Sequence, residues 1–213
     1  MLSNKFKVNY SVGAVANGVK TDTFTFFLLF FYSNIIGLNP GLAGSAIFIA
    51  LCIDAITDPL MGTISDRTNS SFGRRHPYMF ISFIPMSLGY ILLFAPRQEW
   101  DMSQTDLFIW MTIFTVITRI GMTLFDIPHR AFGGEVTKDY KERTILMSWR
   151  EMFAWVAGLS NAFLGYGVFF ASTPEFPQGQ LNPDVWFPFA LTGAAIMVFS
   201  VLYSSLSLSL IHI

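Results

Sequence analysis

The stretch "CIDAITDPLMGTISDRTNSSFGRR" (residues 52–75) places two carboxylates inside an apolar segment that ends in a basic loop. Asp54 and Asp58 are four residues apart, so a helix would bring both to one face, with Thr57 beside them. Two carboxylates on one face repel each other unless a proton or a cation lies between them. The surrounding sequence decides whether their environment is water or lipid.

Composition indicates lipid. Of the 213 residues, 53% are hydrophobic and 13% are charged, about half the charged share of a soluble domain. The chain is therefore predicted to be an integral membrane protein whose surroundings are a lipid bilayer. The net charge of −1 gives no reason to expect a nucleic-acid partner, and the single cysteine, Cys52, excludes a disulfide within the chain.

Six apolar segments approach the roughly 20 residues that a spanning helix needs. They cover about 12–36, 42–64, 77–94, 107–127, 145–170 and 187–207. No alternating pattern competes with them, so we expect an all-α bundle of six transmembrane helices over residues 1–207. The last residues, "LSLIHI" (208–213), resemble the translation of a sequencing adapter. We therefore expect them to be an artefact at the end of a fragment.

Basic residues are unevenly divided between the two sides of such a bundle. One side carries only Arg97; the other carries Lys5, Lys7, Arg67, Arg74, Arg75, Lys138, Lys141 and Arg143. Because loops rich in lysine and arginine stay in the cytoplasm, we expect both ends of the bundle and the loops after the second and fourth helices to be cytoplasmic.

Charged side chains within the spans are concentrated on the first, second, fourth and fifth helices. Because such groups are costly in lipid, they mark functional sites by default. They are Lys20, Asp22, Asp54, Asp58, Arg119, Asp126, Arg130, Arg150 and Glu151. Their segregation favours a lined pathway. The alternative is a set of structural ion pairs in which Arg119 and Lys20 neutralise the aspartates.

The fourth helix carries a polar stripe. Arg119, Thr123, Asp126 and Arg130 recur at spacings of four, three and four residues, so they share one face. We expect this stripe to face the aspartate pair. Carboxylate and hydroxyl oxygens are ligands that suit Na⁺, and the same carboxylates alone suit a proton.

The loop "GTISDRTNSSFGRRHPY" (62–78) resembles the signature that follows the second helix in the major facilitator superfamily. The resemblance implies a conformational role in which Asp66 tethers neighbouring helix ends and the arginines pair with helix C-termini and acidic groups. The residues concerned are Gly62, Asp66, Arg67, Gly73, Arg74 and Arg75.

A finer resemblance is to the glycoside-pentoside-hexuronide:cation symporters. Four stretches carry it in order and at family spacing: "FFYSNIIGL", "DAITDPLMG", "TLFDIPHRAFGGEV" and "SWREMFAWVAG". The resemblance implies that Asp54 and Asp58, with Thr57 and Thr123, bind the coupling cation. It also implies that Asp126 and Arg150 bind a sugar.

Two positions depart from the family pattern. The lysine–aspartate pair that binds sugar on the first helix of this family falls on Asn17 and Gly18, whereas Lys20 and Asp22 lie about one turn further along. We expect Lys20 and Asp22 to bind substrate at that displaced level. On the fourth helix Arg130 replaces an aromatic residue and, with His129, would suit an anionic sugar.

The expected activity is Na⁺- or H⁺-coupled sugar symport by alternating access, in a bacterial inner membrane and with no cofactor besides the coupling ion. Members of this family have about twelve helices in two halves, so the chain resembles an N-terminal half whose C-terminal half is missing, and it is not expected to transport alone. The alternatives are a transporter of a non-sugar solute and a non-transporting receptor on the same fold. An enzyme is not expected, because the spans contain no HExxH or GxSxG motif.

Overall fold

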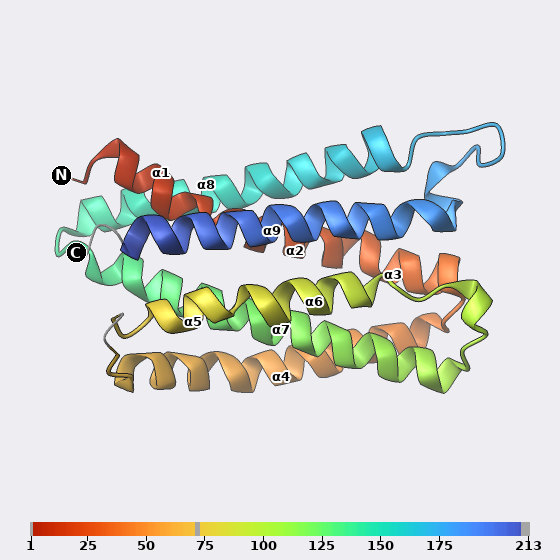
Figure 1. Ribbon diagram of the computed structural model, residues 1–213, viewed down its shortest axis with the longest axis horizontal. Helices are drawn as coiled ribbons and strands as arrows, with labels where there is room; N and C mark the ends of the chain where they lie inside the picture. The colour runs from red at the N-terminus through yellow and green to blue at the C-terminus, as the bar shows by residue number, and fades with distance from the viewer. Residues whose placement is uncertain (1, 71–72, 210–213) are drawn as a thin grey trace.

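The computed structural model describes residues 2–70 and 73–209. These residues form an elongated helical bundle (Figure 1). The α-helices are α1 Asn4–Val12, α2 Ala14–Asp22, α3 Leu28–Phe30, α4 Pro40–Arg67, α5 His76–Ile81, α6 Phe83–Leu93, α7 Gln104–Glu135, α8 Tyr140–Leu164 and α9 Trp186–Ser209. The predicted adapter sequence falls mostly on residues 210–213, which lie outside the described residues, and its origin stays a prediction.

The first apolar segment is not one regular helix. After α2, the backbone passes through a π-helical turn at Thr23–Phe27, the short α3, and a second π-helical turn at Phe31–Ile36. Gly37 ends the segment with a φ of 87°, in the left-handed region that glycine adopts without a steric penalty. Each π turn accommodates an extra residue, and such turns are frequent at functional sites.

Five helical stretches are long and apolar enough to cross a membrane among the residues that the structure describes. They are Pro40–Arg67, His76–Leu93, Gln104–Glu135, Tyr140–Phe169 and Pro183–Ser209. Each covers all or all but the last residue of one predicted segment. The remaining predicted segment, 12–36, is the one that the π turns divide.

The helices extend beyond the predicted apolar segments. Asn39 begins α4 by accepting a hydrogen bond from the Gly41 amide, and α7 continues past Pro128 to Glu135. Hydropathy marks the part of a helix that suits lipid, whereas the helix itself continues while its backbone groups remain paired. His129 and Arg130 are therefore helical, beyond the predicted end of the span at residue 127.

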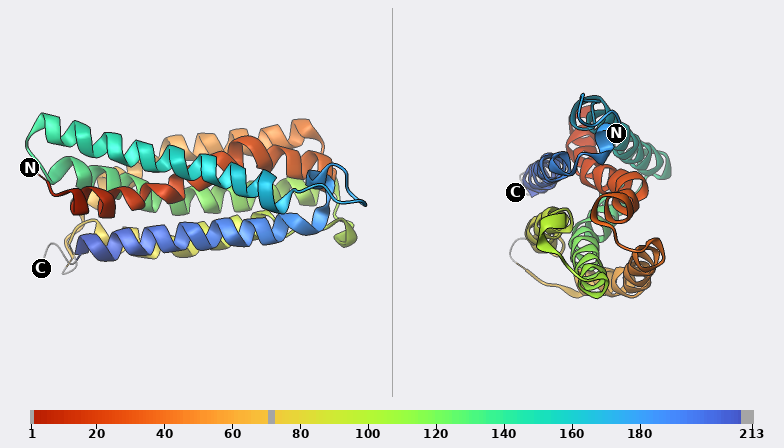
Figure 2. Two further views of the ribbon diagram at one scale, coloured as in Figure 1. Left: turned by 90° about the horizontal axis from the view of Figure 1, so that it is seen from above. Right: turned by 90° about the vertical axis from the view of Figure 1, so that its right-hand side faces the viewer.

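The bundle has two groups of helices (Figure 2). In one group α7 packs against α4 and α6, and in the other α2 packs against α8 and α9; α6 and α9 also meet. Glycines permit the closest approaches: a Cβ added to Gly18 would lie 2.1 Å from the backbone oxygen of Ala154. Such contacts between small residues are typical of helix packing in membranes.

Both ends of the described chain lie at the same end of the bundle as the 67–76 and 135–140 connections (Figure 1). The connections 37–40 and 94–104 lie at the opposite end. This up-and-down arrangement is the one that the apolar segments predict, and it gathers the basic loops at one end.

Candidate functional site

Two side-chain contacts join α4 to α7 at the aspartate pair. Arg119 forms a salt bridge with Asp54, and the Thr123 hydroxyl donates to Asp58 Oδ1 at 2.7 Å. Asp54 and Arg119 are 65 residues apart in the sequence, as are Asp58 and Thr123. On each helix the two residues that form contacts are four residues apart. Because residues four apart lie on one helix face, the contacts form two successive rungs between the two helices. We call this pair of contacts the α4–α7 ladder.

The rung formed by Asp54 and Arg119 leaves two polar atoms without hydrogen-bond partners among the described residues. Asp54 Oδ1 and Arg119 Nε are buried and have no hydrogen-bond partner among the described residues. The Thr57 hydroxyl donates to the backbone carbonyl of Asp54 at 3.5 Å rather than to a carboxylate. The structure thus brings Asp54, Asp58 and Thr123 together with Arg119, while Thr57 lies alongside.

Arg119 has a second contact. Its guanidinium carbon lies 5.5 Å from the centre of the Phe24 ring, within the range of a cation–π interaction. Phe24 lies in the first π-helical turn. The Arg119 side chain is 13% exposed and that of Asp54 is 21% exposed, so the pair is shielded from bulk water on most sides.

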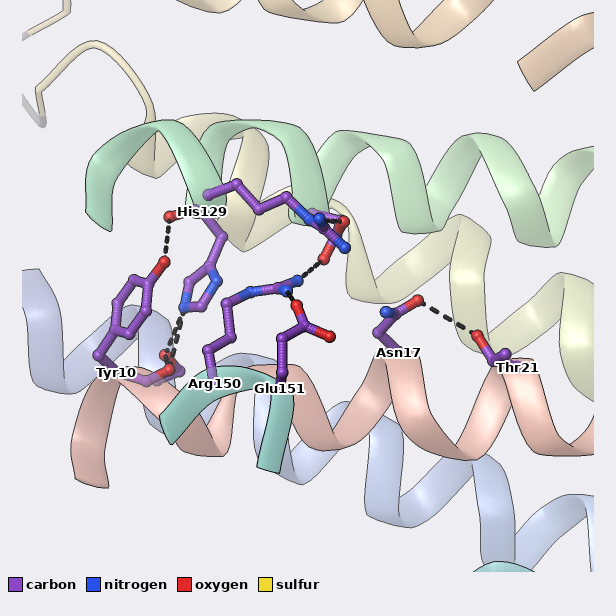
Figure 3. A network of polar contacts seen from close by, with 9 residues as sticks. Tyr10, Asn17, Thr21, His129, Arg150 and Glu151 are labelled. Atoms are coloured by element: carbon purple, nitrogen blue, oxygen red, sulfur yellow. Dashed lines mark hydrogen bonds and ion pairs between the residues drawn. The ribbon is translucent and has the colours of Figure 1, made fainter. Parts of the chain in front are cut away.

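A second charged cluster joins α7 to α8. Arg150, which is fully buried, forms a salt bridge with Asp126 and donates to Glu151 Oε1 at 2.6 Å (Figure 3). Asp126 also accepts from Arg130 Nε at 2.6 Å. We call these four residues the α7–α8 cluster. The two predicted substrate-binding residues, Asp126 and Arg150, are therefore in direct contact.

Lys20 and Asp22 lie on different sides of α2. Lys20 lies within electrostatic range of Asp54, Asp58 and Asp126, and it has no salt bridge with any residue that the structure describes. Asp22 instead accepts a hydrogen bond from Asn161 of α8 at 2.7 Å. Residues two apart on a helix do not face each other, so Lys20 and Asp22 have different neighbours, and their shared role in substrate binding stays a prediction.

Asp22 belongs to a buried polar chain that the sequence analysis missed. Asn161 Nδ2 donates to Asp22 and also to the Thr23 hydroxyl, at 3.1 Å, and Thr23 shares a 2.7 Å hydrogen bond with the Tyr90 hydroxyl. This series of hydrogen bonds therefore connects α8, the first apolar segment and α6. The available signal was Asn161 itself, an amide side chain within an apolar span, where polar groups need a partner.

A cavity of about 340 Å³ lies between α2 and α8. Its polar lining includes Asn17, Asp22 and Glu151, and its aromatic lining includes Trp155 and Phe26. Asn17 accepts a weak hydrogen bond from Thr21 at 3.5 Å, one turn further along α2 (Figure 3). Polar groups at a few points in an otherwise apolar cavity are typical of small-molecule sites.

His129 does not accompany Arg130. It is fully buried and stacks on Tyr10 with ring centres 4.2 Å apart, and its Nε2 lies 3.1 Å from the Tyr10 carbonyl (Figure 3). The Tyr10 hydroxyl in turn donates to the His129 carbonyl at 3.1 Å. Because Arg130 is exposed and His129 faces α1, the two do not form the joint anion site that was expected.

A third cluster lies at the end of the bundle. Arg75 contacts Asp66 at 2.8 Å and Glu135 at 2.9 Å, while Arg74 contacts Glu135 at 3.2 Å. Asp66 thus ties the end of α4 to the loop, and Glu135 adds the end of α7. Gly73 has a φ of 88°, a left-handed conformation that disfavours a side chain.

The remaining two residues of the predicted loop lie on α4. A Cβ added to Gly62 would lie 3.8 Å from the Ile127 side chain of α7, and Arg67 occupies the last turn of α4. A cation in that turn interacts favourably with the carbonyl end of the helix dipole.

A profile of the MFS/sugar transport protein family matches residues 9–209. The chain belongs to this family. Its members are transporters rather than enzymes, and the resemblance to glycoside-pentoside-hexuronide:cation symporters is confirmed. The inner membrane symporter YicJ of Escherichia coli is 31% identical over 77% of this chain and 35% of its own length.

Two further relatives differ in the solutes that their names state. The putative glycoside/cation symporter YagG of Escherichia coli is 31% identical over 75% of this chain and 34% of its own length. The sodium-dependent lysophosphatidylcholine symporter 1-A of Danio rerio is 29% identical over 79% of this chain and 31% of its own length. The chain spans about a third of the length of these relatives.

Proposed function

We propose that residues 1–207 are the N-terminal six-helix half of a secondary transporter that couples a cation, Na⁺ or H⁺, to the movement of a sugar or glycoside. The carrying observation is the position of the α4–α7 ladder beside the α7–α8 cluster, since α7 contributes to both. An ion bound at one group would therefore act on a solute bound at the other through a single helix. Such coupling is reciprocal: each ligand raises the affinity for the other.

The proposed fold has six spans, with residues 12–36 as the first. At about 1.5 Å per residue, a helical segment of this length extends about 38 Å, enough to cross the hydrocarbon core. The proposed orientation places the end with the basic loops in the cytoplasm of a bacterial cell, with the bundle in the inner membrane. The name and origin of YicJ support this membrane.

The proposed cation ligands are Asp54, Asp58 and Thr123, with Thr57 as a supporting residue beside the Asp54 carbonyl. Their oxygens are hard ligands of the kind that Na⁺ prefers. No group of three or more His, Cys, Asp or Glu side chains gathers in residues 2–70 or 73–209. The ladder therefore offers at most two carboxylates to an ion.

The proposed substrate ligands are Asp126 and Arg150 of the α7–α8 cluster, with Asp22 at the adjoining cavity. Carboxylates accept hydrogen bonds from hydroxyl groups, and guanidinium groups donate hydrogen bonds to them. Trp155 supplies an aromatic face for a sugar ring. Lys20, which lies within electrostatic range of the ladder and of Asp126, is a further proposed substrate ligand. Exposed Arg130 would admit an anionic sugar.

Alternating access needs a second half that closes the site, so we expect the 213-residue chain alone to show no transport. The test uses a whole transporter containing these residues, reconstituted in vesicles with a neutral or an acidic glycoside, while Na⁺, Li⁺ and pH are varied independently. Saturable uptake that one ion gradient drives and that Asp126→Asn abolishes is the expected result. Uptake independent of every ion gradient would contradict coupling.

A second function keeps the fold but changes the solute. The name of the zebrafish relative includes a lysophospholipid, and the cavity beside α8 has aromatic walls at Phe26 and Trp155. An amphiphilic solute would use these rings and the apolar face of α8. In the same uptake assay, inhibition by a glycoside would favour sugar transport, and inhibition by lysophosphatidylcholine would favour the second function. Inhibition by neither would favour a receptor.

A further inference from the structure

Arg119 occupies the position that a coupling cation would need at Asp54. Its guanidinium forms the salt bridge with one carboxylate oxygen of Asp54, while the ring of Phe24 lies against it. The next rung of the ladder, between Thr123 and Asp58, has a hydroxyl where the first has a cation. The two rungs are thus geometrically equivalent and chemically different.

The chain supplies a cation of its own at the ladder. Arg119 contacts Asp54, and the Thr123 hydroxyl contacts Asp58. Two like charges on one helix face need a bound cation only when nothing else neutralises them. At Asp54 the guanidinium therefore takes the part that a bound ion would otherwise take.

A metal ion at the ladder would also meet charge repulsion and would lack a ligand. Na⁺ bound between Asp54 and Asp58 must lie near the guanidinium, where like charges repel across a poorly hydrated space. It would also lose Asp54 Oδ2, which Arg119 holds. The one free carboxylate oxygen at this rung, Asp54 Oδ1, is buried.

We propose that Arg119 is a tethered cation that competes with a metal ion for Asp54 and so determines the coupling-ion selectivity of the ladder. This inference rests on the proposed function, because it concerns the proposed cation site. While Arg119 is paired with Asp54, the ladder does not bind Na⁺ or Li⁺. Removal of the guanidinium converts the two rungs into an acidic site that does.

The experiment measures equilibrium binding of radioactive Na⁺ to the purified 213-residue chain in lipid nanodiscs. The variants are Arg119→Gln and Arg119→Ala, which remove the charge, and Arg119→Lys, which keeps it. Arg97→Gln is the matched control, since it removes a positive charge from an exposed residue in a connection between helices. Each sample is first checked for helical content and for elution as a single species.

We expect no saturable Na⁺ binding by the wild-type chain, Arg97→Gln or Arg119→Lys. Both neutral variants should gain saturable binding, with at least about tenfold more Na⁺ retained than the non-saturable background of the wild type, within the usual range for coupled sites. Adding Asp54→Asn to Arg119→Gln should abolish the gain. A purely structural Arg119 would change stability without changing which ion binds.

Equal Na⁺ binding by the wild type and Arg119→Gln would overturn the proposal, as would no gain in either neutral variant. A further measurement needs no variant: thermal unfolding of the wild-type chain should be the same in Na⁺ and in N-methylglucamine, and a saturable rise in Na⁺ alone would also overturn it. None of these measurements uses a sugar. Failure of glycoside uptake therefore counts against the proposed function alone, and Na⁺ binding by the wild type counts against the tethered cation alone.

Discussion

Two arginine–aspartate pairs among the described residues join α7 to another helix, and they differ in how firmly the arginine is held. Arg150 is fully buried and contacts two carboxylates, those of Asp126 and Glu151. Arg119 is 13% exposed and contacts one carboxylate and one aromatic ring. A buried guanidinium that loses its carboxylates has no water to replace them, so its release is costly.

This difference indicates which arginine can exchange partners. Arg150 is suited to hold Asp126 in a fixed position, because every movement would leave a buried charge unpaired. Arg119 can leave one carboxylate for another anion or for water at a smaller cost. A ligand shifts an equilibrium between two conformations only where it interacts differently with them, so the arginine that can change partners is the better candidate for such a shift.

The largest expected effect on stability is that of Arg150→Ala. This change removes the buried guanidinium from Asp126, which keeps only Arg130, and from half-exposed Glu151. It should lower the free energy of unfolding by about 3 kcal/mol, the lower end of the range for breaking a buried pair. Titration of the chain with a denaturing detergent, followed by circular dichroism, measures it. A loss below about 1 kcal/mol would remove the basis for calling Arg150 the more firmly held arginine.

Arg119→Gln should cost less, about 1–3 kcal/mol, because it leaves the buried Asp54 carboxylate partly unsatisfied but permits access to water. The same titration applies, and Arg119→Lys is the control that retains the charge. If Arg119→Gln destabilises the chain more than Arg150→Ala does, the order of the two pairs is reversed and the comparison fails.

The sequence predicts much of this arrangement. The long apolar segments become α4, α7, α8 and α9, since length and hydropathy are local properties. The spacing of Asp54 and Asp58, together with the stripe on the fourth helix, predicts that the two helices face each other, and the Thr123–Asp58 contact agrees. These predictions rest on helical periodicity, which the sequence carries directly.

Partners across the bundle are less predictable. The π-helical turns within 23–36 leave no mark in "TFTFF" or "FYSNII", because they depend on how the first segment packs. Asp22 accepts a hydrogen bond from Asn161, 139 residues away in the sequence. Only the directions of the two side chains show that Asp22 and Lys20 have different neighbours. The alternative of ion pairing within the spans was correct for Arg119, and spacing alone did not decide between Asp54 and Asp58.

Tyr90→Phe tests whether neutral buried contacts follow the same order. It removes the hydroxyl that shares a 2.7 Å hydrogen bond with Thr23 and leaves the ring in place, so the expected loss is about 1 kcal/mol. Tyr203→Phe is a matched control, because its hydroxyl contacts Asn9 in an exposed position. Equal losses in the two variants would show that burial does not set the energy of these contacts.

The smallest effect is expected at the end of the bundle, where two adjacent arginines share Glu135. The Arg74 side chain is 54% exposed and that of Arg75 is 7% exposed. Because an exposed salt bridge is screened by water, Arg74→Ala should change the free energy of unfolding by at most about 0.5 kcal/mol. Arg75→Ala, which releases both Asp66 and Glu135, should cost clearly more in the same titration.

High salt should reduce what remains of the Arg74 effect and alter the Arg75 effect less, since buried pairs are screened less. A salt-independent loss in Arg74→Ala equal to that in Arg75→Ala would contradict the link between burial and strength on which the comparison of Arg119 with Arg150 depends.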